Sequence, residues 1–263
     1  MRVCAVRGAL RWQAMNRNSF RDFFRNRRVK RHVARHGDVY DFRGVGVSVP
    51  LSAGLGAASA LLRGKYERAE AALIERHLPG DRPVIELGGS LGVVSALIRS
   101  RLSPGVRHVV VEANPDILET CAANARRGAA AGETEIVHAA YFPGGGSVRF
   151  LLGAEVHANA LDDGGGGGRS ITVPAVSLTD LRARIGDSEG FTLVSDIEGG
   201  EAALFLEEEA MLDHVGMIIA ELHPHAYGAQ GTTTAALLEI ARAHGLVEID
   251  RMDDTVVLAR KPN

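Results

Sequence analysis

The chain has 263 residues, of which 46% are hydrophobic and 24% charged, which suits one globular domain with a small appendage and excludes a collagen, a coiled coil and a disordered chain. Its two cysteines, Cys4 and Cys121, are too few for a disulfide framework, so we expect a reducing compartment and a cytoplasmic protein. The net charge of −2 conceals an asymmetry. Eleven basic residues against one acid give residues 1–36 a charge of +10, and the remainder carries −12.

Residues 1–36 are predicted to form a basic helical segment. Phe20, Phe23 and Phe24 stand at helical spacing among arginines and give it one apolar patch. That patch fits docking on the body of the protein, whereas the basic residues fit an anionic surface such as a membrane or a phosphorylated substrate. No other segment is typical of a nucleic-acid-binding module, so no nucleic-acid partner is expected.

Residues 37–62 predict a short hairpin followed by a Gly/Ala loop, and residues 64–78 predict an amphipathic helix that ends at Pro79-Gly80. We therefore divide the chain into a basic N-terminal helical and hairpin appendage, residues 1–63, and a main domain, residues 64–263.

From residue 83 apolar strands alternate with helices of 10–15 residues, which is typical of a parallel sheet with helices on both faces. The predicted strands are 83–87, 108–111, 136–141, 148–152, 171–176, 191–195, 217–220, 246–249 and 255–259. The predicted helices are 93–102, 115–127, 201–213 and 234–244, with a further short helix capped by Thr179-Asp180. The last two strands and their tight turn add an antiparallel edge, and the five glycines 164–168 predict a flexible loop.

A glycine-rich turn follows the first strand of this alternation. Gly88 and Gly92 frame it, and glycine lets a backbone turn tightly and approach a ligand without a Cβ atom in the way. The third position from Gly88 is Ser90, so the dinucleotide pattern G-x-G-x-x-G fails. A carboxylate at Glu86 would repel a pyrophosphate but attract the sulfonium and ammonium groups of S-adenosylmethionine. A second acid, Glu112, ends the next strand, where a carboxylate can accept both ribose hydroxyls. The alternative is that both acids are ordinary exposed loop residues.

Several short blocks of the chain share the pattern of one enzyme family. They are Gly64-Lys65-Tyr66-Glu67, Val84-Ile85-Glu86-Leu87-Gly88-Gly89-Ser90-Leu91-Gly92, Val111-Glu112-Ala113-Asn114-Pro115 with Asn124, Ala139-Ala140, Asp196-Ile197-Glu198-Gly199-Gly200-Glu201 and Glu221-Leu222-His223. By these blocks, residues 64–260 resemble the FkbM family of S-adenosylmethionine-dependent methyltransferases. The resemblance implies a class I methyltransferase (Rossmann-like) fold with a seven-stranded, mostly parallel sheet, and O-methylation of hydroxyls on sugars or other secondary metabolites. One departure is Val194, where the family often has a lysine two residues before the aspartate.

The turn, the acid-tipped strands and the resemblance together predict a cofactor site. We expect Glu86 and the turn to hold the methionine end of S-adenosylmethionine, Glu112 the ribose, and residues 139–141 the adenine. The predicted cofactor residues are Glu86, Gly88, Gly89, Ser90, Leu91, Gly92, Glu112, Ala113, Asn114, Ala139, Ala140, Tyr141 and Asp196.

Acidic and histidine side chains follow two later strands and form the predicted reaction centre. Methyl transfer needs a well-placed acceptor, and an alcohol acceptor benefits from a general base. We expect Asp196 to position the acceptor or the donor's amino group, and His223 to act as the base because an imidazole titrates near neutrality. Glu198 completes the predicted catalytic set, and acceptor contacts are expected from Tyr66, Glu221 and His225.

Each of these assignments has a structural alternative. Glu198 and Glu201 fit the N-terminus of the next helix, where acids are favoured, and His223 before Pro224 fits a loop histidine. Acidic and histidine side chains are also metal ligands, but no tight ligand spacing supports a metal, so none is expected.

The sequence thus predicts an S-adenosylmethionine-dependent O-methyltransferase acting on a hydroxyl of a small molecule or glycan. Two alternatives stay open: a nicotinamide-dependent oxidoreductase on a similar sheet, and a non-catalytic binding protein that retains the methyltransferase fold, which the missing lysine allows. Because there is no long exposed apolar heptad, we expect a monomer or a homodimer.

Overall fold

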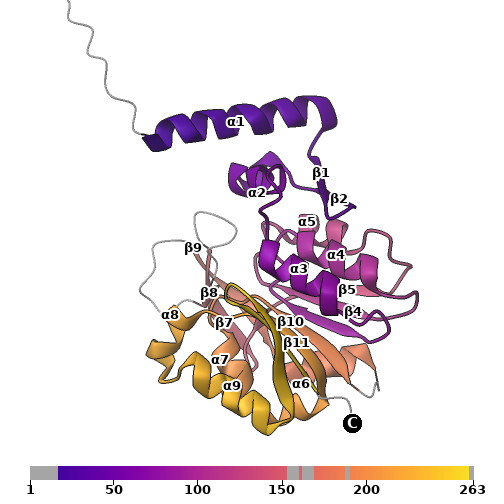
Figure 1. Ribbon diagram of the computed structural model, residues 1–263, viewed down its shortest axis with the longest axis vertical. Coiled ribbons are helices and arrows are strands. Elements are labelled where there is room, and N and C mark those ends of the chain that lie inside the picture. The colour runs from indigo at the N-terminus through magenta and orange to yellow at the C-terminus, as the bar shows by residue number, and fades with distance from the viewer. Residues whose placement is uncertain (1–16, 153–159, 162–168, 187–189, 261–263) are drawn as a thin grey trace, which may run out of the picture.

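The computed structural model describes residues 17–152, 160–161, 169–186 and 190–260, and their side chains except those of residues 17–25 and 160–161. Its centre is a seven-stranded sheet in the order β12-β13-β11-β10-β3-β4-β5 (Figure 1). The strands are β3 (Val84–Leu87), β4 (His108–Glu112), β5 (Thr134–His138), β10 (Phe191–Ser195), β11 (Val215–Glu221), β12 (Leu246–Met252) and β13 (Thr255–Arg260). β13 alone runs opposite to the other six strands. The predicted class I methyltransferase fold, with its antiparallel C-terminal edge, is confirmed.

The two faces of the sheet have separate cores, because successive side chains of a strand point to opposite faces. Helices α3 (Arg68–His77), α4 (Val93–Arg101) and α5 (Leu118–Ala125) cover one face, and α6 (Leu178–Ile185), α7 (Glu201–Glu207) and α9 (Thr234–Ala243) cover the other (Figure 1). In β3, Val84 packs into the first core and Ile85 into the second. Every residue of β3, β4 and β10 is buried, as expected for strands covered on both sides.

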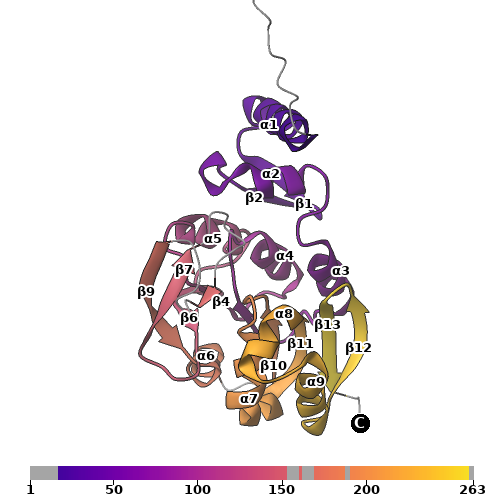
Figure 2. The same ribbon diagram turned by 90° about the vertical axis from the view of Figure 1, so that its left-hand side faces the viewer.

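The N-terminal appendage forms a layer over α4 and α5 (Figure 2). It consists of α1 (Arg17–His36), the hairpin of β1 (Val39–Phe42) and β2 (Val45–Ser48), the 3-10 helix η1 (Leu51–Ala53) and α2 (Leu55–Leu61). The predicted hairpin is confirmed, but the predicted Gly/Ala loop is wrong, because its second half folds as α2 and buries Ala57, Ala58 and Leu61. Phe20, Phe23 and Phe24 lie outside the described side chains.

The layer and the main domain share one core. Val29 of α1 and Val47 of β2 are fully buried in the same cluster as Leu97 of α4. Asn124 on α5 adds a polar link: its side chain accepts a hydrogen bond from Ser48 N and donates to Ser48 O and Leu91 O, each at 2.8 Å. Packing therefore crosses the predicted boundary at residue 63.

A second, four-stranded sheet lies beside the first and contains β6 (Ala140–Tyr141), β9 (Arg169–Val176), β7 (Ser147–Leu152) and β8 (Ala160–Leu161) in that order. The predicted strands at 148–152 and 171–176 are confirmed here, outside the main sheet. The predicted strand 136–141 is split, since β5 belongs to the main sheet and β6 to the second one. The glycine run 164–168 lies outside the described residues.

Several helices begin or end at residues other than those predicted. α3 begins at Arg68, and the predicted helix 201–213 is α7 followed by the 3-10 helix η2 (Glu209–His214). The cap of α6 is Ser177 rather than Thr179, since its hydroxyl accepts from Asp180 N and the Asp180 carboxylate accepts from Ser177 N. Two short helices, α8 (Pro224–Tyr227) and η3 (Gly228–Gln230), follow β11. Among the helices that the structure describes, none has the length and apolarity needed to cross a membrane.

Candidate active site

The register of the main sheet brings the key residues into one row. Strands β11, β10, β3 and β4 reach the carboxyl edge level with one another. Across that edge stand, in order, Glu221, Asp196, Gly88 and Glu112. Because neighbouring strands are about 4.8 Å apart, Asp196 and Glu112 flank a gap of roughly 10 Å whose middle position, Gly88, has no side chain.

A cavity of about 280 Å³ opens at this edge. Most of the predicted site residues line it, namely Gly88, Ser90, Glu112, Ala113, Ala139, Ala140, Tyr141, Asp196, Glu198, Glu221 and His223. The lining also includes Glu67, Val111, Phe150, Ile197 and Gly200, which were not among the predicted site residues. Of these, Glu67 stands in one of the blocks that carry the resemblance, so it had a sequence signal, whereas Phe150 comes from the second sheet and had none.

Close backbone approach explains the glycines of the turn. A Cβ atom on Gly88, whose φ is +91°, would lie 2.0 Å from the carbonyl oxygen of Asp196. A Cβ atom on Gly92 would lie 2.4 Å from the carbonyl oxygen of Cys121 on α5. The turn is thus pressed between β10 and α5, and no side chain larger than hydrogen fits at either position.

Glu112 is the best-defined polar group of the cavity. It is 6% exposed, and its two carboxylate oxygens accept hydrogen bonds from Ser90 N and Asn114 N, both at 2.6 Å. Burial raises the pKa of Glu112 to about 7, although the backbone N–H groups of Asn114 and Ser90 oppose this shift. A carboxylate has about four acceptor positions, so two remain for a ligand with two hydroxyls.

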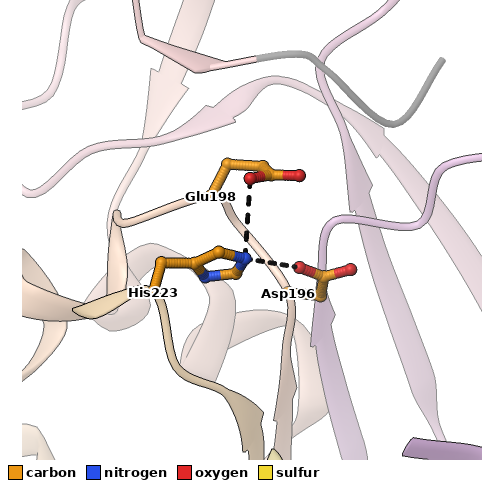
Figure 3. Close-up of side chains that lie close together, drawn as sticks. All are labelled: Asp196, Glu198 and His223. Carbon is orange, nitrogen blue, oxygen red and sulfur yellow. Dashed lines mark ion pairs between the residues drawn. The ribbon is translucent and has the colours of Figure 1, made fainter. Parts of the chain in front are cut away.

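At the other end of the cavity, His223 stands among acids (Figure 3). Its Nε2 lies 3.6 Å from Asp196 Oδ1 and 3.5 Å from Glu198 Oε2, and its Nδ1 lies 3.3 Å from Glu201 Oε1. Burial alone would lower the pKa of His223, but the carboxylates of Glu201, Asp196 and Glu198 outweigh it and raise the pKa to about 9. These carboxylates stabilise the protonated imidazole, which disfavours the predicted role of His223 as the general base.

The carboxylates around His223 hold their protons more tightly than usual. Burial and the charges of Glu221 and Glu67 raise the pKa of Asp196 well above its ordinary value, although His223 opposes them. Burial and the charges of Glu221 and Glu198 raise the pKa of Glu67 to about 7. In its ionised form, an acid with a raised pKa is a stronger base than a free carboxylate, so Asp196 and Glu67 are candidates to accept a proton.

Glu201 holds the loop that carries this cluster. It is fully buried, and its carboxylate accepts hydrogen bonds from Ile197 N and Gly199 N, both at 3.1 Å. It also accepts from the hydroxyl of Tyr227 at 3.2 Å, and that hydroxyl accepts from His223 N at 2.9 Å. The predicted alternative for Glu201, a role at the start of α7, agrees with these contacts. Glu198 instead faces the cavity.

Two predicted site residues, Glu86 and Tyr66, do not line the cavity. Glu86 lies on the face of β3 that packs against α4, where it accepts from Ser95 Oγ at 2.7 Å and lies 2.8 Å from His108 Nε2. It does not line the cavity, so its predicted contact with the cofactor is corrected. Tyr66 is 5% exposed and packs edge-to-face on Phe42 at 5.9 Å, while its hydroxyl lies close to Ser90, so its predicted contact with the acceptor stays a prediction.

The remaining predicted residues support the cavity from behind. Gly89 and Gly92 pack against Cys121, and Leu91 is fully buried. Asn114 donates its backbone N–H to Glu112 without lining the cavity. His225 is exposed on α8, with its ring 5.8 Å from that of His223, so it borders the site from outside.

A second cavity of about 470 Å³ adjoins the first and shares Glu67 and Glu221 with it. Its other charged lining residues are Lys65, Arg68, Glu70, Asp253 and Asp254. Carboxylates therefore continue from the edge of the sheet into this second space.

The solved structures that match this chain include several methyltransferases. A methyltransferase from Pyrococcus furiosus is 13% identical over 91% of this chain and 98% of its own, with a TM-score of 0.45. An O-methyltransferase from Bacillus cereus, solved in complex with SAH, is 13% identical over 73% of this chain and 79% of its own, with a TM-score of 0.40. The pyocyanin biosynthetic protein PhzM is 15% identical with a TM-score of 0.38, and the match covers 77% of this chain but only 58% of PhzM.

At this level of similarity the fold assignment rests on the strand order of the sheet rather than on these neighbours. No family model and no curated protein matches the chain. Membership of the FkbM family therefore stays a prediction.

Proposed function

We propose that the protein is an S-adenosylmethionine-dependent methyltransferase, and that it methylates a hydroxyl of a small molecule or glycan as members of the FkbM family do. The observation that carries the proposal is the row of Asp196, Gly88 and Glu112 at the carboxyl edge of the sheet. It combines a carboxylate with two open acceptor positions, a gap without a side chain, and a second carboxylate across the gap.

The charge of the cavity favours this ligand over a dinucleotide. The lining contains five carboxylates, and among the described lining residues the one basic side chain is His223. A pyrophosphate would lie among acidic side chains there, with a single histidine as its basic neighbour, which argues against the nicotinamide alternative. A ligand with a ribose diol and a positive sulfur suits both ends, with the diol at Glu112 and the cationic part toward Asp196.

The cofactor would supply an activated methyl group, so the protein's task is to place the acceptor and take up its proton. Asp196 lines the first cavity, and Glu67 lines both the first and the second cavity. A carboxylate within hydrogen-bond reach of the acceptor hydroxyl orients it and receives its proton as the new C–O bond forms, a contribution of about 10²–10⁴-fold in rate. His223 lies beside these carboxylates, with its Nε2 between Asp196 and Glu198.

The second cavity bears on the acceptor. Since acids dominate its lining, we infer an acceptor that is neutral or cationic near the reacting hydroxyl, and not a phosphorylated one.

Calorimetry with S-adenosylhomocysteine and, separately, with NADH tests the proposal. We expect saturable binding of the first and none of the second. Binding of NADH alone would overturn the assignment. Binding of S-adenosylhomocysteine without transfer of labelled methyl groups to any neutral or cationic hydroxyl acceptor would favour a non-catalytic protein instead.

A further inference from the structure

The distances between His223 and its acidic neighbours do not fit hydrogen bonds from a protonated ring. Its side chain is nine-tenths buried, and its Nε2 faces Asp196 Oδ1 at 3.6 Å and Glu198 Oε2 at 3.5 Å (Figure 3). Charge-assisted hydrogen bonds are about 2.7–2.9 Å long, so both contacts are too long. Asp196 Oδ1 is buried and has no hydrogen-bond partner among the described residues. One nitrogen thus points between two carboxylates and bonds to neither.

A second histidine of the chain shows what an ordinary pairing looks like. His244 also lies between two carboxylates, but each ring nitrogen serves one of them: Nδ1 lies 2.8 Å from Asp213 Oδ1 and Nε2 lies 2.9 Å from Glu209 Oε1. The doubly protonated ring satisfies that site completely. At His223 the two carboxylates share one nitrogen, which can offer a single proton.

The separations at His223 suit a shared metal ion instead. Two ligand atoms bound at about 2.1 Å with tetrahedral angles stand about 3.4 Å apart, close to the two distances observed. One atom each from Asp196, Glu198 and His223 lie within 4.8 Å of one another. Glu67 and Glu221 form a second such group with Asp196, so further oxygen ligands are near.

From this geometry we propose that Asp196, Glu198 and His223 form a binding site for a divalent transition-metal ion. One imidazole with carboxylates favours ions such as Zn²⁺, Co²⁺ or Mn²⁺ over Mg²⁺ and Ca²⁺, which prefer oxygen ligands alone. The expectation from the sequence that no metal binds is thereby revised. If the proposed methyl transfer is correct, on which this last step rests, such an ion would bind the acceptor oxygen and favour loss of its proton.

Metal titration of the full chain, first stripped with a chelator, tests the site without any assay of activity. Calorimetry with Zn²⁺ and visible absorbance with Co²⁺ are expected to show one saturable site. His223→Gln is expected to weaken binding by at least about 100-fold, since even changes beyond the direct ligands cost 10–100-fold. The matched control His244→Gln, which alters a histidine between two acids elsewhere, is expected to leave metal affinity unchanged.

A second variant protects the test against misfolding. Glu198 is about one-third exposed, so Glu198→Gln is expected to fold and still to lose at least about tenfold in metal affinity. No saturable binding to the wild-type chain, or equal binding by wild type and both site variants, would overturn the proposal. Titration of the same samples with S-adenosylhomocysteine separates the two hypotheses, because binding of that ligand without binding of metal refutes only the metal site.

Discussion

The substitution Glu112→Gln tests the candidate site most directly, because it keeps the size of the side chain and removes its charge. Burial raises the pKa of Glu112 from 4.5 to about 7. The folded state therefore holds this proton more tightly than the unfolded chain does. The free energy of unfolding must then fall as the pH rises from about 4.5 to about 7, and it levels off above that.

The size of the effect follows from the two pKa values. Between pH 5 and pH 8 this one group lowers the free energy of unfolding of the wild-type protein by about 2.5 kcal/mol. Glutamine does not titrate. Between pH 5 and pH 8 the free energy of unfolding of the variant should therefore fall by about 2.5 kcal/mol less than that of the wild type. Glu67, whose pKa is also raised, titrates alike in both proteins and cancels from the comparison.

Urea denaturation at pH 5, 6, 7 and 8 measures this difference. The control Glu119→Gln changes an exposed acid on α5 and should follow the wild type. At pH 8 Glu112→Gln should also weaken S-adenosylhomocysteine by about 100-fold, since two hydrogen bonds from hydroxyls to a charged acceptor are worth about 3 kcal/mol together. Parallel pH profiles for Glu112→Gln and wild type, or unchanged ligand affinity, would refute the reasoning.

Three further substitutions probe the surroundings of the site. Gly88→Ala forces a Cβ atom against the Asp196 carbonyl and should cost at least about 2 kcal/mol in urea denaturation, whereas Gly46→Ala, with open space around it, should stay within about 0.5 kcal/mol of wild type; equal effects would contradict the steric argument. Glu86→Gln should lower the free energy of unfolding by about 2 kcal/mol through its buried partners, yet calorimetry should find S-adenosylhomocysteine affinity within about twofold of wild type, and a large loss would restore Glu86 to the cofactor site. Ser177→Ala removes the cap of α6 and should lower the free energy of unfolding, measured by urea denaturation, by about 1 kcal/mol. This loss would be absent if Thr179 were the true cap.

The main sheet could be predicted from the sequence because its signals are local. Apolar strands such as 191–195 alternate with helices, and a parallel sheet places the residues after each strand along one edge. That rule sufficed to group Gly88, Glu112, Asp196 and Glu221. It worked because the register of β3, β4, β10 and β11 is level, which no local pattern reports.

The predictions failed where the result depends on the direction of a side chain or on residues that are distant in the sequence. Glu86 stands two residues before Gly88, but the pleat turns its side chain toward α4 instead of the cavity. The pKa of His223 is raised by Asp196, Glu198 and Glu201, which follow β10, whereas His223 follows β11. Helix α2 was missed because its Ala, Gly and Leu residues have no polar face from which a helical period could be read.

The side chain of Asn124 links the N-terminal layer to the glycine-rich turn. It fastens β2 to Leu91, inside the turn whose Ser90 amide supports Glu112. A protein shortened to start at residue 64 would sever two of its three bonds and leave a buried amide facing empty space. The layer therefore supports the glycine-rich turn at the edge of the cavity, and a chimaera with a different N-terminal layer would have to keep the backbone groups of β2 that bind Asn124.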